Sequence, residues 1–264
     1  ETSQVADAIL EHYQPRYTGD AMPASKAGFA VGIADRLDSL AGLFAAGLAP
    51  TGTKDPFAQR RSAIGLVQLL SNFDLDFDLL KWLTTAAQTL PIPATEDSLR
   101  SCQEFIVGRQ RSNLIEQGYR YDVVDAVLAS QHNNPAGVLR AVRQLTEWVG
   151  KPDWNTTLQA YARCVRITRD QKEIHPINEQ LLNEPTEKEL FSALKKVEEA
   201  AREGDSVDEV FTRFVPMIPA INRFFDAVLV MAENPAIRSN RLGLLQRISA
   251  LPKHAADLSL LEGF

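Results

Sequence analysis

The sequence Ala34-Asp-Arg-Leu-Asp-Ser-Leu-Ala-Gly-Leu-Phe-Ala-Ala-Gly-Leu-Ala-Pro-Thr-Gly-Thr-Lys-Asp-Pro-Phe-Ala-Gln-Arg-Arg61 predicts a helix, a stop and a second helix. Apolar residues recur at three- and four-residue spacing, which marks one buried helical face: Ile33, Leu37, Leu40, Ala41 and Phe44. Gly47, Pro50 and Gly52 end the first helix. Asp55 followed by Pro56 predicts the N-cap and first residue of the second helix, which carries Arg60 and Arg61.

The same helical periodicity continues along the rest of the chain. Ala, Leu, Glu, Gln and Arg are abundant, and alternating apolar stretches longer than four residues are absent. We therefore expect an all-α protein that is more than about 60% helix. The expected helices are 3–13, 25–47, 56–73, 77–90, 98–116, 122–129, 136–149, 154–169, 186–203, 206–231 and 234–261. The expected N-caps include Ser25, either Asp205 or Ser206, and Asn234.

Breaks in this pattern mark turns and one linker. Gly150-Lys-Pro-Asp153 is the strongest linker candidate, and Pro216 and Pro219 should kink or split the 206–231 helix. The motif Asp74-Leu-Asp76-Phe-Asp78 lacks the glycine and glutamate of a calcium loop. These acids are better explained as helix-start residues that complement the dipole of the 77–90 helix.

The composition of the 264 residues is that of a globular protein, with 45% hydrophobic and 23% charged residues. The net charge of −6 excludes a uniformly basic nucleic-acid binder. The segment from Arg100 to Lys172, however, contains eleven Lys and Arg residues and only seven Asp and Glu residues. A local basic face can bind RNA because phosphate attraction acts within about 8–10 Å. The alternative is that these charges only solvate helices.

Signatures of catalysis are missing from the sequence. The two cysteines, Cys102 and Cys164, form no metal-ligand spacing or disulfide framework, which suits a reducing cytoplasm. The four histidines are scattered, and no phosphate-binding glycine loop or nucleophile elbow occurs. We expect neither a membrane span nor a signal peptide, and we expect a fragment of a longer protein because the chain starts inside a helix without Met.

The stretch quoted above also resembles a known family. Ala34–Leu40 and Pro50–Arg61 resemble the corresponding runs in the beta subunit of bacterial-type glycyl-tRNA synthetase, a type that includes cyanobacterial and plastid enzymes. The resemblance implies the end of a domain similar to the HD hydrolase fold, in which Asp35 occupies the place of the last metal-binding aspartate. A divalent metal needs several ligands, so we expect no metal at Asp35.

A second resemblance covers the C-terminal portion. Tyr161–Ile167, Ile221–Val228 and Ile237–Leu245 resemble the helical anticodon-binding domain of arginyl-tRNA synthetases, although its Asp-Ala-Leu-Arg signature is not spelled out. Three regions are therefore expected: 1–55 as the end of an HD-like domain, 56–150 as a helical body, and 151–264 as the anticodon-binding domain.

The family resemblance implies a function for the whole complex. A cytoplasmic heterotetramer of alpha and beta subunits would ligate glycine to tRNA-Gly, with ATP and Mg²⁺ bound by the alpha subunit. This fragment would bind the tRNA-Gly anticodon region without catalysis or a cofactor of its own. The alternatives are a helical scaffold that holds subunits together without touching RNA, and a metal-dependent phosphohydrolase related to the HD fold.

Candidate tRNA-binding residues are side chains that can stack on bases or bond to phosphates and base edges. They are Arg163, Arg166, Asn222, Arg223, Arg241, Arg109, Arg111, Lys54, Arg60 and Arg61. Structural alternatives remain for several of them. Asn222 and Arg223 could form an interhelical hydrogen bond, and Arg241 could pair with Glu233 or Glu262.

Overall fold

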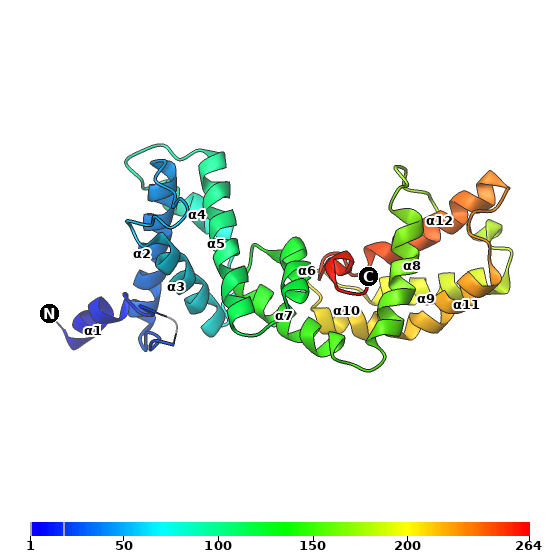
Figure 1. Cartoon of the computed structure of the whole chain (residues 1–264), viewed down its shortest axis with the longest axis horizontal. Coiled ribbons are helices and arrows are strands. Elements are labelled where there is room, and N and C mark those ends of the chain that lie inside the picture. Colours follow the sequence, from blue (N-terminus) through cyan, green and yellow to red (C-terminus); the bar gives the residue numbers. More distant parts are fainter. Residues whose placement is uncertain (1, 18) are drawn as a thin grey trace. The chain divides into compact units, whose positions relative to one another are not determined.

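The computed structural model describes residues 2–17 and 19–264 of the chain. The protein is 66% helical, and no strand occurs in the described ranges, which confirms the all-α prediction (Figure 1). The helices are α1 Ser3–Glu11, α2 Lys26–Ala45, α3 Gln59–Asn72, α4 Leu79–Ala87, α5 Glu96–Glu116, α6 Tyr121–Gln131, α7 Pro135–Val149, α8 Trp154–Thr168, α9 Pro185–Ala200, α10 Val207–Phe214, α11 Ile218–Ala227 and α12 Pro235–Ala250. Three short 3-10 helices are η1 Glu179–Leu181, η2 Val215–Met217 and η3 Leu258–Leu260.

The chain divides into two compact units. Unit 1 consists of Glu1–Tyr119 and Gln131–Arg140, and unit 2 of Arg120–Ser130 and Ala141–Phe264. α7 therefore belongs to both units, since the division falls after Arg140. The three-region division drawn from the sequence stays a prediction.

Unit 1 is built around α2, which packs against α1, α3, α4 and α5. The apolar face expected from residues 33–44 is buried in the core of this unit. The same core contains the fully buried side chains Leu66, Leu69, Leu70, Leu79, Leu83 and Ile106. Burying each such side chain contributes about 1.5–3 kcal/mol, so the packing of α3, α4 and α5 around α2 stabilises this unit.

Unit 2 packs α8 against α12 and α11, and α9 against α11. Its core is rich in aromatic rings: Trp154, Tyr161, Phe211, Phe214 and Phe224. The Tyr161 hydroxyl donates to the Ser249 carbonyl at 2.9 Å, which satisfies the polar end of a buried ring. Burial raises the pKa of the Tyr161 phenol well above its ordinary value.

Most expected helix caps are present. Ser25 accepts from the Gly28 amide, Asp78 from the Lys81 amide, and Asn234 from the Ala236 amide. Ser206 forms a reciprocal capping box with Glu209. Each cap satisfies a backbone donor at a helix start, and each typically stabilises a helix by about 1 kcal/mol.

The start of α3 differs from the prediction. The helix begins at Gln59, three residues after Pro56, because Ala58 adopts a left-handed conformation with φ 53°. Asp55 still caps this helix, since its carboxylate accepts from the Gln59 amide at 2.8 Å and the Arg60 amide at 2.9 Å. The predicted N-cap position was therefore wrong, because Ala58 is the N-cap residue and Pro56 lies before the helix, although the Asp55 side chain does accept from the first amides of α3.

The prolines of the 206–231 segment split it as expected. α10 ends at Phe214, the 3-10 turn η2 contains Pro216, and α11 contains Pro219 in its first turn. The last expected helix is shorter than predicted: α12 ends at Ala250, and turns with η3 follow. Pro252, directly after α12, is incompatible with continued helix.

The motif at residues 74–78 binds the α6–α7 turn, which also belongs to unit 1. Asp76 accepts from the Asn134 side chain and Asp78 from the Asn133 side chain, both at 2.7 Å. Arg140 pairs with Asp74 and Asp76. Hydrogen bonds from Asn134 and Arg140 lower the pKa of Asp76. Asp78 is the predicted helix-start acid, whereas Asp74 and Asp76 bind a distant segment of sequence.

Gly243 on α12 should not tolerate a larger side chain. A Cβ at this position would overlap the backbone carbonyl of His175, which packs across the helix. We expect Gly243→Ala to lower the free energy of unfolding by about 1–3 kcal/mol because a backbone segment must move. Urea denaturation would measure the change.

The matched control is Gly108→Ala on α5, where the space is open, so that alanine should stabilise the helix by about 0.5–1 kcal/mol. Equal effects of the two substitutions would contradict the prediction.

Candidate RNA-binding surface

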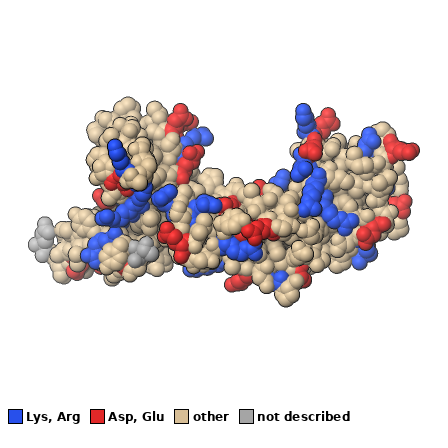
Figure 2. Space-filling model, viewed as in Figure 1, with Lys and Arg blue, Asp and Glu red and all other residues tan. Residues whose placement is uncertain are grey.

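Two of the candidate arginines lie against aromatic rings on the exposed side of α8. The Arg163 Cζ lies 4.3 Å from the centroid of the Phe225 ring on α11. Arg166, one turn later, lies 5.5 Å from the ring centroid of Phe264. A guanidinium stacked on a ring keeps its N–H edge free for a phosphate or a base. We call Arg163, Arg166, Phe225 and Phe264 the α8 surface, and Figure 2 shows basic side chains over this helix with acidic ones nearby.

The C-terminal segment is held beside this surface. The Gln159 side chain donates to the Gly263 carbonyl at 2.5 Å, and the Phe264 ring lies 6.2 Å from the ring of Tyr161. In the same segment, the Glu262 carboxylate accepts from the Tyr121 hydroxyl at 2.5 Å. These contacts fix the ring over which Arg166 lies.

The two candidates on α11, Asn222 and Arg223, differ in their exposure and in their hydrogen bonds. Arg223 is exposed, and both its Nε and Nη2 bond to Glu189 of α9, which raises the pKa of Arg223. The neighbouring Asn222 is half-buried, and its side chain forms no hydrogen bond among the described residues. The two side chains therefore do not share one interhelical hydrogen bond. Asn222 lies one helical turn before Phe225, on the same side of α11.

Arg241 lies inside unit 2. Its side chain is bonded to Glu187 through Nε at 2.5 Å and to the Leu229 carbonyl through Nη1 at 2.8 Å. Arg241 is 8% exposed and Glu187 is fully buried. The partner is thus Glu187, and not Glu233 or Glu262. This geometry gives Arg241 a structural task in joining α12 to α9.

The candidates on α5 are partly engaged within the chain. The Arg109 guanidinium lies 5.7 Å from the Phe105 ring, and its buried Nε has no hydrogen-bond partner in the described ranges. Arg111 is half-buried and already interacts within the protein.

Of the remaining candidates, Lys54 lies on the loop before α3, and Arg60 and Arg61 lie in the first turn of α3. Lys54 is exposed and pairs its backbone with Thr51 in an isolated bridge. Arg60 donates to the Gly52 carbonyl at 2.5 Å and lies 3.8 Å from Asp55, so that it braces this loop. Arg61 is exposed and lines a pocket of about 400 Å³ on unit 1.

No set of three His, Cys, Asp or Glu side chains that could hold a metal ion occurs in the described part of the chain. Asp35 is exposed on α2. Burial raises the pKa of both cysteine thiols, Cys102 and Cys164, to about 12, so neither is an activated nucleophile. Among the described residues, no helix is long and apolar enough to cross a membrane.

The sequence alone missed the aromatic partners of the α8 surface. Phe225 belongs to the run Arg223-Phe-Phe-Asp226, in which only one of two adjacent phenylalanines can face the core. That pattern was the available signal, since Phe224 is fully buried and Phe225 is not. Phe264 offered no such signal.

The chain is thus an all-helical protein that places two arginines against aromatic rings on α8. Residues 1–129 match the family model of the glycyl-tRNA synthetase beta subunit, and residues 157–259 match the DALR anticodon binding domain. The chain belongs to the glycyl-tRNA synthetase beta-subunit family.

Several relatives align with almost the whole chain. A glycine–tRNA ligase beta subunit of Acidovorax sp. (strain JS42) is 40% identical over 270 residues, which is 98% of this chain and 36% of that protein. The chloroplastic/mitochondrial glycine–tRNA ligase 2 of Arabidopsis thaliana is 35% identical over 267 residues, covering 100% of this chain and 25% of that protein. The beta subunit of Neisseria meningitidis serogroup A is 34% identical over 266 residues and is covered to 38%. The chain thus spans well under half of these relatives.

Proposed function

We propose that unit 2 binds the anticodon region of tRNA-Gly, so that a partner alpha subunit can ligate glycine to the same tRNA with ATP. The family match and the DALR domain match over 157–259 support a tRNA-related function. The observation that carries the proposal is the stacking of Arg163 on Phe225 within the matched range. The chain would contribute recognition, while the alpha subunit would hold ATP and Mg²⁺ and perform the chemistry.

The chemistry of the α8 surface suits a single-stranded RNA loop. Splayed bases stack on aromatic rings and arginine planes, and phosphates bind the free N–H edges. Glycine anticodons end in two cytosines, whose edges offer an amino donor and acceptors. Arg163 and Asn222 supply donors for those acceptors, and the exposed carboxylate of Asp226 on α11 supplies an acceptor for the amino group.

Replacing both Arg163 and Arg166 by alanine should weaken tRNA-Gly binding by about 1–3 kcal/mol and reduce the dependence of binding on salt, because two phosphate or base contacts are lost. Fluorescence anisotropy with labelled tRNA-Gly across a salt series would measure both quantities.

The matched control is Arg223→Ala, which removes an exposed arginine already paired with Glu189. It should change the affinity by less than about 0.5 kcal/mol. Wild-type affinity and salt dependence in the double variant would favour the alternative, a helical scaffold without RNA contact.

The cytoplasmic location also stays a prediction, and one relative is named as chloroplastic/mitochondrial.

A further inference from the structure

Unit 1 contains a pocket that the proposed anticodon contact does not use. It has a volume of about 400 Å³ and lies between α2, the turn after α1 and the residues that lead into α3. We call it the α2 pocket. The side chains that matter for its chemistry are Tyr13, Asp35, Phe57, Gln59 and Arg61.

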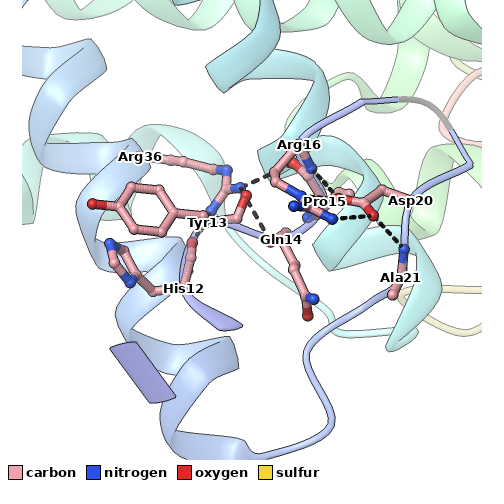
Figure 3. Close-up of polar contacts among 8 residues, drawn as sticks. All are labelled: His12, Tyr13, Gln14, Pro15, Arg16, Asp20, Ala21 and Arg36. Atoms are coloured by element: carbon pink, nitrogen blue, oxygen red, sulfur yellow. Dashed lines mark hydrogen bonds and ion pairs between the residues drawn. The ribbon is translucent and has the colours of Figure 1, made fainter. Parts of the chain in front are cut away.

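One wall of the α2 pocket is held in place by a buried arginine. Arg36 donates to five carbonyls, those of His12 (2.9 Å), Gly32 (2.8 Å), Tyr13 (3.1 Å), Gln14 (3.1 Å) and Pro15 (3.2 Å). Figure 3 shows the turn after α1 wrapped around this guanidinium. Arg16 is likewise engaged, because it forms a two-pronged pair with Asp20 at 2.8 and 3.1 Å. These two arginines shape the wall and have few N–H groups left for a ligand.

Other groups in the pocket are available. Arg61 and Asp35 are both exposed, and neither side chain forms a hydrogen bond or a salt bridge among the described residues, although Asp35 interacts electrostatically with the neighbouring Arg36. Two aromatic side chains stand open to solvent at the pocket, with Tyr13 61% and Phe57 51% exposed. The pocket thus offers an unpaired cation, an exposed carboxylate that makes no hydrogen bond, and two ring faces within one concave surface of unit 1.

The backbone and one buried side chain carry further signs of a binding site. Ala58 adopts the left-handed conformation, which costs a non-glycine residue roughly 1–2 kcal/mol. The next residue, Gln59, is 1% exposed. Its Nε2 donates to the Leu48 carbonyl at 2.7 Å, but its Oε1 has no donor. A buried acceptor without a partner is unfavourable by about 1–3 kcal/mol, and both features lie in the pocket lining.

These groups together select a class of ligand. Arg61 suits a phosphate, and the exposed rings suit a base. The carboxylate of Asp35 and the Gln59 oxygen only accept hydrogen bonds, so they need hydroxyl or amino donors, which a fully ionised phosphate lacks. A ribose 2′-hydroxyl or an exocyclic amino group provides them. We propose that the α2 pocket binds one nucleotide of single-stranded RNA, with the phosphate on Arg61, the base on Phe57 and a ribose hydroxyl toward Asp35.

This site lies within unit 1 and involves none of the α8 surface, so it does not rest on the proposed anticodon contact. The test can therefore be made with the α8 surface disabled. The protein is the whole chain carrying Arg163→Ala and Arg166→Ala, and the probe is an eight-nucleotide single-stranded RNA that contains one 5-iodouridine. Irradiation should link this RNA to the tryptic peptides that contain Tyr13 or Phe57, as read by mass spectrometry.

Affinities from fluorescence anisotropy complete the test. In the same background, Phe57→Ala and Arg61→Ala should each weaken binding of the RNA by about tenfold, since each removes a stacking or phosphate contact. Arg100→Ala is the matched control, because this exposed α5 arginine lies outside the pocket lining and only 3.9 Å from Glu96. It should change the affinity less than twofold.

DNA of the same sequence tests the ribose contact. It should bind about threefold or more weakly than the RNA, because the hydroxyl donor is missing. Crosslinks confined to unit 2, or equal binding by the Phe57→Ala, Arg61→Ala and Arg100→Ala variants, would overturn the α2 site. Equal binding of DNA and RNA would overturn the assignment to RNA. If Arg163→Ala/Arg166→Ala leaves tRNA-Gly binding intact, the proposed anticodon contact fails, while the crosslink result still decides the α2 site.

Discussion

Replacing Arg36 by alanine is expected to lower the free energy of unfolding of unit 1 by about 3–5 kcal/mol. Arg36 is 6% exposed, and its guanidinium donates to five backbone carbonyls. Hydrogen bonds that involve a charged group contribute more than neutral ones, and carbonyls left without a donor are unfavourable. Desolvation lowers the pKa of Arg36, because burial disfavours the charged form. The loss is therefore larger than for an exposed arginine.

Urea denaturation followed by far-ultraviolet circular dichroism would measure this effect, and hydrogen exchange would locate it in the turn after α1. Arg36→Lys should recover only a small part, because an ammonium has three donors on one atom and cannot reach carbonyls spread over residues 12–15. The control is Arg100→Ala, an exposed arginine of the same unit, which should change stability by less than about 0.5 kcal/mol. A change below about 1 kcal/mol for Arg36→Ala would contradict the role assigned to Arg36.

The second large effect is expected at the Glu187–Arg241 pair. Glu187 is fully buried on α9, and the Arg241 Nε lies 2.5 Å from its carboxylate. Removing one partner leaves the other as an uncompensated buried charge, so Arg241→Met should destabilise unit 2 by about 3–5 kcal/mol. Glu187→Ala should cost at least as much, since Glu187 also accepts from the Glu184 amide at the start of α9.

A double-mutant cycle separates this pair from its surroundings. The Glu187→Gln/Arg241→Met double variant should be less destabilised than the sum of the Glu187→Gln and Arg241→Met single variants, because no unpaired charge remains. Glu189 and Arg223, on α9 and α11, form the matched exposed pair, with a coupling energy expected below about 1 kcal/mol. If the buried and exposed pairs show equal coupling energies in urea denaturation, burial is not what makes the Glu187–Arg241 contact strong.

The sequence by itself determined the helical class and most helix positions. Apolar spacing in residues 33–44 predicted the buried face of α2, and Ser25, Asp78, Ser206 and Asn234 correctly marked helix starts. These signals are local: a cap or an amphipathic face depends on residues three or four positions apart. The quoted runs also carried the family resemblance, which the family matches confirm.

The tertiary structure decided which charged side chains already bind other groups of the protein. Arg36, Arg241 and Arg163 look alike in sequence, yet the first binds backbone carbonyls, the second a buried glutamate, and the third an aromatic ring. Their partners lie on other segments, up to 62 residues away for Arg163 and Phe225, and no local pattern reports them. The delayed start of α3 at Gln59 also depends on the folded loop, in which Asp55, Gln59 and Arg60 bond to groups 4 to 11 residues away. Charge and helix propensity are properties of single residues and short windows, whereas the availability of a side chain for RNA depends on contacts between distant parts of the chain.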